Sequence, residues 1–272
     1  MIQGFETREQ TDIPIRALVK SANGILHKRN EVVGQYEKTN WATFKTVKDY
    51  PCAVFGILRG TADIIRECQK EKQDFYYFDH AYFLGNKHSI SNEIGDKIYR
   101  LTKNHYHIQK IETLNNEDKK RIEKYRDYLF SKLEPWKTSG KHIIIIEPSE
   151  FQIWYHNIHN WVENTVNILK QHTDREIIVR TKQSQVSLDE HLNNAHAVVT
   201  HNSNVVFQAL LKGIPCFVDK INMGVEICDT DFTKIETPKK LFREHWFDTI
   251  LANQFTLKEI EDGTAWRKVN EK

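Results

Sequence analysis

In the second half of the chain, short apolar runs alternate with amphipathic segments, and each apolar run gives way to polar residues. The apolar runs are typical of buried strands and cover His142–Ile146, Glu176–Arg180, Ala197–Thr200 and Pro215–Val218. The segments between them predict helices over Trp161–His172, Ser187–Asn194 and Val205–Lys212. Ser187 has the position of an N-cap and Gly213 that of a C-cap. The alternation predicts a parallel sheet, whose ligands bind beyond the carboxyl ends of its strands.

The first half carries a less regular form of the same pattern. The run Cys52–Leu58 leads through Arg59 and Gly60 into a helix-like segment, and a second strand candidate follows at Phe75–Phe78. This order predicts a β-α-β unit. Two further segments are Ile15–Leu26, which fits a strand, a helix or both, and Arg121–Leu133, which fits a charged helix.

One segment has the composition of a linker. Glu134–Lys141 contains Pro, Ser and Gly, which favour turns over regular structure. It predicts lobes at 1–134 and 142–250, followed by a helical tail at 251–272, and lobes of this size are usual domains. The sequence therefore predicts an α/β protein of two Rossmann-like lobes that face a cleft.

Composition narrows the class of protein. The 272 residues include 39 Lys and Arg against 37 Asp and Glu, a formal net charge of +2, which argues against a chain built mainly to coat nucleic acid. The first residues lack the pattern of a secretory signal, and Ile143–Ile146 is too short to cross a bilayer. The four cysteines form no CxxC pair, so we expect them to be reduced and packed in a cytoplasmic protein without a membrane partner.

The strongest candidate for a binding site is the turn that follows the strand Ala197–Thr200. Its residues His201, Asn202, Ser203 and Asn204 open a helix, and the free N–H groups and dipole at a helix start attract anions such as a diphosphate. The alternative is a well-capped helix without a ligand. Other polar side chains at strand ends on the same edge are Glu147, Ser149, Arg180 and Lys182. The two cations among them suit phosphate binding, although solvated loop cations are the plainer interpretation.

The segment Thr200–Phe217 resembles the donor site of GT-B-fold glycosyltransferases, especially capsule-polysaccharide transferases. The resemblance rests on the Ser-containing turn, on Gln208–Leu211 (Q-A-L-L) and on Gly213–Phe217 (G-I-P-C-F). It implies that Ser203 and Asn204 face the phosphates of a nucleotide-sugar and that Gln208 approaches the ribose. We expect the donor to be a UDP-sugar. The family usually has an acid at the position of Gln208, whose amide can still hydrogen-bond a ribose hydroxyl.

A second resemblance rests on Thr173–Lys182 (T-D-R-E-I-I-V-R-T-K) together with Asn253–Trp266. Both segments are similar to phage-encoded glycosyltransferase-like proteins. This resemblance implies a metal-independent transferase without a cofactor, acting on 5-hydroxymethylpyrimidines of phage DNA. A capsule or lipopolysaccharide glycan is the competing acceptor.

In the first lobe, Asp79 and His80 follow a strand candidate and are the best candidates for a general base in an inverting transfer. The alternative is that Asp79 caps a turn and His80 bonds locally. Residues expected to contact the acceptor are Arg59, Gly60, Tyr82, Arg100 and His105. Tyr82 suits stacking on an extruded base, with a core position as the alternative. Arg100 and His105 suit a nucleic-acid backbone, with a surface strand and loop as the alternative.

Other classes of function remain open from the sequence. A non-catalytic nucleotide- or DNA-binding module would use the same lobes, and a sugar-nucleotide epimerase shares their architecture. A metal site is not expected, because His156 and His159 have no carboxylate or Cys companion in a zinc pattern. The sequence carries no signal for an oligomeric state.

Overall fold

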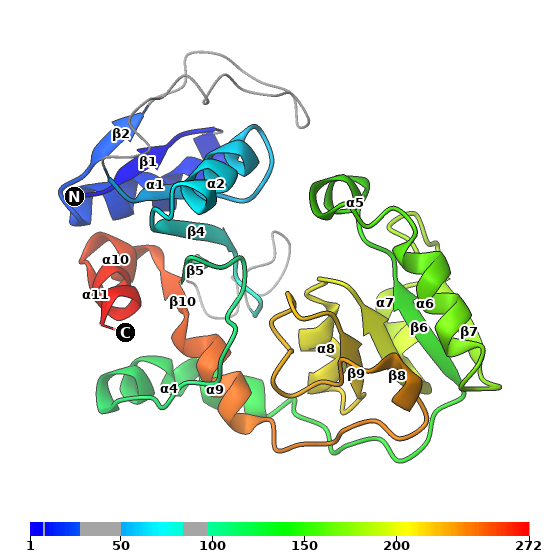
Figure 1. Ribbon diagram of the computed structural model, residues 1–272. Helices are drawn as coiled ribbons and strands as arrows, with labels where there is room; N and C mark the ends of the chain where they lie inside the picture. The colour runs from blue at the N-terminus through cyan, green and yellow to red at the C-terminus, as the bar shows by residue number, and fades with distance from the viewer. Residues whose placement is uncertain (8, 28–49, 84–96, 272) are drawn as a thin grey trace. The chain divides into compact units, whose positions relative to one another are not determined.

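The computed structural model describes residues 1–7, 9–27, 50–83 and 97–271. The chain divides into a first unit, Met1–Tyr106 with Ala252–Lys272, and a second unit, His107–Leu251. Each unit is built on a sheet with helices, so the expected α/β class with two lobes is confirmed (Figure 1). The cleft between the lobes stays a prediction.

The first unit contains a six-stranded mixed sheet in the order β10-β5-β4-β3-β1-β2. Four neighbouring strands are parallel: β1 (Gln3–Phe5), β2 (Ile25–His27), β3 (Cys52–Phe55) and β4 (Phe75–His80). Two strands run antiparallel to their neighbours: β5 (Ile98–Lys103) and β10 (Gln254–Thr256). The mixed segment expected at Ile15–Leu26 holds both element types, since α1 (Glu9–Ser21) ends there and β2 begins.

Helices cover both faces of this sheet. On one face, α1, α10 (Leu257–Glu261) and α11 (Thr264–Asn270) bury a cluster that includes Leu18, Phe78 and Phe255. On the other face, α2 (Thr61–Lys70) packs Ile64 and Ile65 against the strands. The C-terminal segment, expected as a helical tail, thus also supplies a strand that pairs with β5 (Figure 1).

The second unit contains a four-stranded parallel sheet in the order β7-β6-β8-β9. The strands are β6 (His142–Ile146), β7 (Glu176–Arg180), β8 (Ala195–Thr200) and β9 (Cys216–Val218). The helices of this unit are α4 (Asn116–Phe130), α5 (Glu150–His156), α6 (Trp161–Leu169), α7 (Leu188–Leu192), α8 (Val205–Leu211) and α9 (Glu244–Ala252), with a short 3-10 turn at Phe232–Lys234. The strands expected at His142–Ile146 and Glu176–Arg180 have the observed bounds.

The division between the units differs from the expected linker at Glu134–Lys141. That segment lies inside the second unit, where the buried Arg243 donates to the carbonyl of Glu134 and stacks 4.2 Å from the ring of Trp136. The helix α4 also belongs to this unit, because Arg126 pairs with Asp248 of α9 at 2.7 Å. Proline and glycine in the segment therefore shape a packed turn instead of a hinge.

Two further expectations concern cysteines and membrane spans. Cys52, Cys68, Cys216 and Cys228 are all free and buried, as expected for packing residues. Over the described part of the chain, no helix combines the length and the apolar character needed to cross a bilayer.

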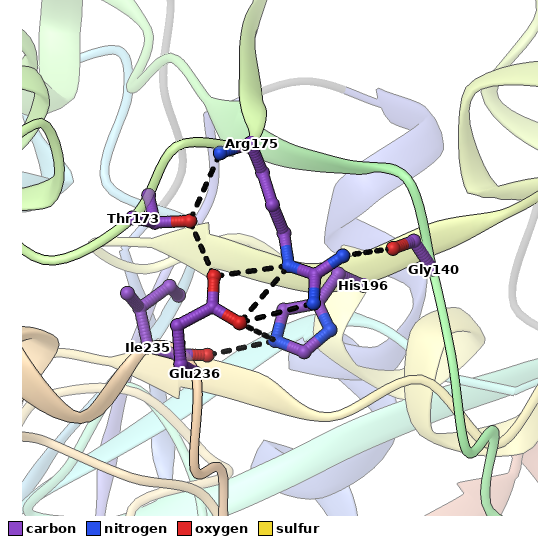
Figure 2. Close-up of polar contacts among 6 residues, drawn as sticks. All are labelled: Gly140, Thr173, Arg175, His196, Ile235 and Glu236. Atoms are coloured by element: carbon purple, nitrogen blue, oxygen red, sulfur yellow. Dashed lines mark hydrogen bonds and ion pairs between the residues drawn. The ribbon is translucent and has the colours of Figure 1, made fainter.

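A polar network closes the amino-terminal edge of the second sheet (Figure 2). Arg175, just before β7, contacts both carboxylate oxygens of Glu236, with its Nε 3.0 Å from Oε1 and 3.1 Å from Oε2. The same guanidinium donates to the carbonyl of Gly140, and His196 lies 2.9 Å from the carbonyl oxygen of Ile235. The network joins the loop that contains Glu236 to the starts of three strands.

This network predicts a pH-dependent contribution to stability. Burial pushes the pKa of Glu236 upward, but hydrogen bonds from Arg175 and Thr173 outweigh it, so the pKa lies below the ordinary 4.5. A depressed carboxylate pKa stabilises the fold above the unfolded-state pKa, and the contribution is lost as pH falls through the folded-state pKa. Because Glu236 is 40% exposed, we expect Glu236→Gln to lower the free energy of unfolding by only about 1 kcal/mol at pH 7.

The measurement is urea unfolding of both proteins at pH 7 and at an acidic pH below the folded-state pKa of Glu236. The difference between them should vanish at the acidic pH. Glu163→Gln, an exposed position on α6, is the control and should change little at either pH. A difference that persists in acid would contradict the assignment to the carboxylate charge.

Candidate functional site

The carboxyl ends of the four strands of the second sheet meet at one edge, because all four strands are parallel. The residues that follow three of them, Glu147 after β6, His201 after β8 and Asp219 after β9, are polar or charged. Side chains alternate between faces along a strand, so His201 and Asp219 lie on the face that α6 covers. This part of the edge is the candidate site.

His201 is the most buried ionisable side chain at this edge. It is 6% exposed and packs between the rings of His156 and Trp161, whose centroids lie 5.1 and 6.0 Å from its own. Burial lowers its pKa to about 4, so the imidazole is neutral at pH 7. Among the described residues, its Nδ1 atom has no hydrogen-bond partner.

Asp219 forms the wall of the site beside His201. Its carboxylate accepts a hydrogen bond from the indole N–H of Trp161 at 2.6 Å. Burial raises the pKa of Asp219, and the Trp161 hydrogen bond opposes that shift. The distance from Asp219 Oδ2 to His201 Nε2 is 3.9 Å, which is too long for a hydrogen bond. Because the imidazole is neutral, the two side chains are neighbours and not an ion pair.

The turn after His201 is held from two sides. The hydroxyl of Ser203 accepts a hydrogen bond at 3.2 Å from the N–H of Val205, the first residue of α8. The side-chain amide of the buried Asn222 lies 3.5 Å from the carbonyl oxygen of Ser203. Asn222 also accepts from the N–H of Gly224 at 2.9 Å. The loop after β9 thereby fixes the position of the turn.

Asn202 adds a second unsatisfied atom at the same turn. The side chain is 7% exposed, and within the described residues its Oδ1 has no hydrogen-bond partner. Leaving a buried polar atom unpaired is costly, so native proteins rarely do so without a reason such as a ligand. Both Oδ1 of Asn202 and one nitrogen of a neutral imidazole can accept from a hydroxyl or an amino group.

The two cations expected at this edge, Arg180 and Lys182, belong to the end of β7 and the loop after it. Nη1 of Arg180 lies 3.2 Å from the Ser184 hydroxyl, 2.6 Å from the Val186 carbonyl and 2.8 Å from His191 Nδ1. Arg180 therefore braces the loop after β7, on the face opposite to His201. Lys182 is exposed in that loop. The role of both cations in phosphate binding stays a prediction.

Four further residues, Glu147, Ser149, Asn204 and Gln208, were expected to contact the donor. The backbone N–H of Glu147 donates to the carbonyl of Arg180, and the hydroxyl of Ser149 caps α5 by accepting from the N–H of Gln152 at 3.3 Å. Asn204 directly precedes α8, and Gln208 is exposed on that helix. Contacts of these residues with a nucleotide stay a prediction.

In the first unit, Asp79 and His80 are the last residues of β4 and pair with Arg100 and Tyr99 of β5. Asp79 Oδ2 accepts from Arg100 at 2.6 Å and from the Tyr77 hydroxyl at 3.1 Å, and Oδ1 accepts from the N–H of His80 at 2.7 Å. This carboxylate holds a buried arginine. Its role as a base stays a prediction.

The expected acceptor residues are only partly available to a ligand. Arg100 is 3% exposed, and its guanidinium lies 4.5 Å from the centroid of the Tyr82 ring, which does not fit a contact with a DNA backbone. Arg59 and Gly60 both have positive φ, 59° and 84°, in the turn between β3 and α2. His105 is exposed in the turn after β5.

Sequence reasoning missed three residues of the site: His156, Trp161 and Asp219. Asp219 directly follows the strand expected at Pro215–Val218, so the rule that selected polar residues at strand ends would have found it. His156 and Trp161 carry no such signal, since their approach to His201 depends on how α5 and α6 pack on the sheet.

Comparisons with known proteins bear on the fold. No protein-family model matches the chain, and no curated protein matches it in sequence. Among solved structures, the chain is similar to a beta Kdo 2,4 transferase of KpsC from Thermosulfurimonas dismutans at a TM-score of 0.48 and 8% identity, over 95% of this chain and 98% of that chain. It is also similar to the beta Kdo 2,7 transferase of the same KpsC at a TM-score of 0.53 and 13% identity, over 99% of each chain. At this identity, the second likeness shows that the chain shares the two-lobe fold of that transferase.

Proposed function

We propose that this protein is a glycosyltransferase that takes a sugar from a nucleotide-activated donor bound at the turn His201–Asn204. The observation that carries the proposal is the pair of buried, unpartnered atoms in the described structure, Nδ1 of His201 and Oδ1 of Asn202, at the carboxyl edge of a parallel sheet. That edge is where such sheets bind ligands. The shared fold with a Kdo transferase supports the same class of reaction.

The site residues suggest how the donor is held. A neutral His201 and the Asn202 carbonyl oxygen accept hydrogen bonds from hydroxyl or amino groups of the donor. The ring of Trp161 provides an apolar wall beside His201. Asp219 keeps this ring in place through its hydrogen bond.

For the acceptor, we propose a hydroxyl of a bacterial glycan. The solved structure with the shared fold is a transferase of Kdo, a sugar. The 5-hydroxymethylpyrimidine of phage DNA, which the sequence resemblance favoured, has no support beyond that resemblance, and Arg100 is buried. A glycan acceptor therefore has the better support.

Donor binding tests the proposal directly. The ligands are CMP, UDP and their sugar conjugates, including nucleotide-activated Kdo, titrated by calorimetry. We expect one of them to bind, and His201→Ala or Asn202→Ala to weaken it about tenfold, the effect of one lost buried hydrogen bond. The same panel, incubated with bacterial oligosaccharides or hydroxymethylated DNA and read by mass shift, identifies the acceptor.

Matched controls come from exposed residues of the same types. His159 and Asn164 are exposed beside and on α6, and their alanine variants should bind within about twofold of the parent protein, as surface changes usually do. If His201→Ala bound the donor as tightly as the parent does, the site would be elsewhere. Hydrolysis of the donor without any acceptor would favour an epimerase-like or hydrolytic reaction.

A further inference from the structure

Strand β7 differs from the other strands of its sheet in how little it is buried. Strands of parallel sheets are normally covered on both faces and read as continuous apolar runs. The strands β6, β8 and β9 follow this rule, but no residue of β7 is buried, although its centre is Ile-Ile-Val. Val179 is 40% exposed. Apolar side chains nearby in sequence are exposed as well: Ile168 at the end of α6 and Val186 in the loop after β7.

The backbone of β7 is open on one side. The strand is the last of its sheet, with β6 as its sole strand neighbour among the described residues (Figure 1). The carbonyl of Arg180 faces β6, because it accepts from the N–H of Glu147 at 3.0 Å. Backbone groups alternate in direction along a strand, so those of Glu176 and Ile178 also face β6. Those of Ile177 and Val179 face outward, where an edge offers a template for another strand.

The sequence of β7 is complementary to itself. We propose that two copies of this protein associate by antiparallel pairing of their β7 strands about a two-fold axis at Ile178. In this register, Ile177 stands opposite Val179 of the second copy, and these are the residues whose N–H and C=O groups face outward. Each of the two equivalent pairs exchanges two backbone hydrogen bonds. The result is a continuous eight-stranded sheet closed by two-fold symmetry.

Charge complementarity favours a second copy as the occupant. The same register places Glu176 opposite Arg180 of the second copy, twice, at positions where side chains of an antiparallel pair approach closely. Parallel pairing in register would instead place Glu176 against Glu176 and Arg180 against Arg180. The contacts of Arg180 with its own loop are made by Nη1, on one side of the guanidinium.

Molar mass over a dilution series tests the proposal. We expect a species of twice 32.2 kDa that dissociates on dilution. Glu176→Arg should weaken association about tenfold or more. In each of the two equivalent pairs, the substituted side chain would place a positive charge opposite Arg180 of the second copy. The double variant Glu176→Arg with Arg180→Glu should recover most of the loss. Glu163→Arg on α6 makes the same charge change on an exposed residue away from β7 and should leave the dimer unaffected.

A second variant and a second measurement guard against misfolding. Val179→Lys replaces a side chain that is already exposed, and a lysine on an edge strand blocks pairing, so we expect a folded monomer. In the parent protein, amide hydrogen exchange at Ile177 and Val179 should slow as protein concentration rises. A parent protein that is monomeric at every concentration, or a dimer in which these two amides exchange freely, would overturn the proposal.

Discussion

Replacing Gly213 by alanine is expected to lower the free energy of unfolding of the second unit by about 4 kcal/mol, from backbone strain and a steric clash together. Gly213 has φ of +70°, in the left-handed region that disfavours other residues. A Cβ atom built on it would lie 1.9 Å from the carbonyl oxygen of Pro135. Neither the helix end nor the Pro135 segment can move easily, since Arg243 donates to carbonyls of both Leu210 and Glu134.

The end of α8 explains why this position is so restricted. The N–H of Gly213 donates to the carbonyl of Leu210, and the N–H of Ile214 donates to that of Ala209 at 2.9 Å. These two bonds form a Schellman motif, which needs a left-handed residue at the position of Gly213.

Thermal unfolding measures the effect. A loss of this size corresponds to a fall in Tm of about 10 °C. Gly56 is the control, because it also has a positive φ, 66°, but a Cβ there would meet nothing within 4 Å. Gly56→Ala should therefore cost only the backbone strain, about 1 kcal/mol. Equal losses at the two positions would show that the contact with Pro135 has no effect.

Replacing Asp79 by alanine is expected to destabilise the first unit by about 3 kcal/mol. The side chain of Arg100 is 4% exposed and lies 2.6 Å from the Asp79 carboxylate. Removing one partner of a buried ion pair leaves the other charge in a poorly solvated environment, and this penalty exceeds the value of the pair itself. The contact of Arg100 with the Tyr82 ring remains in the variant and limits the loss.

Asp74→Ala is the matched control for this prediction. Asp74 pairs with Lys103 at 2.9 Å in the same unit, but both side chains are partly exposed, by 41% and 31%. Exposed pairs contribute about 0–1 kcal/mol. Unfolding can be followed through Trp266, which packs 4.9 Å from Tyr76 in this unit. If both variants lost equally little stability, Arg100 would not depend on Asp79.

The activity of Asp79→Asn distinguishes two roles for Asp79, that of a general base and that of an anchor for Arg100. A general base contributes about 100-fold or more to turnover, so a catalytic Asp79 predicts a kcat loss of that size in folded Asp79→Asn, with an unchanged donor Kd. An anchoring Asp79 predicts that activity falls only with the fraction of folded protein. Assays well below the unfolding temperature distinguish the two.

The strands of the second unit were predictable because their signals are local. The runs at His142–Ile146 and Glu176–Arg180 consist of β-branched residues bounded by polar ones, and the structure has the same bounds. The cap at Gly213 was likewise readable, since a glycine directly after an apolar helix favours that ending. Elements without such signals were missed: β1 and β10 have three residues each, and α5 buries none of its residues.

Local pattern therefore accounts for the α/β class, the order of elements in the second unit and the turn at His201–Asn204. It does not account for properties that depend on residues distant in the chain. Trp161 reaches Asp219 across 58 positions and Arg243 reaches Glu134 across 109, and Asp79 meets Arg100 through strand pairing. Which strand lies at an open edge, and which buried atoms lack a partner, follow from packing of the whole unit, because burial and pairing are properties of the assembled sheet.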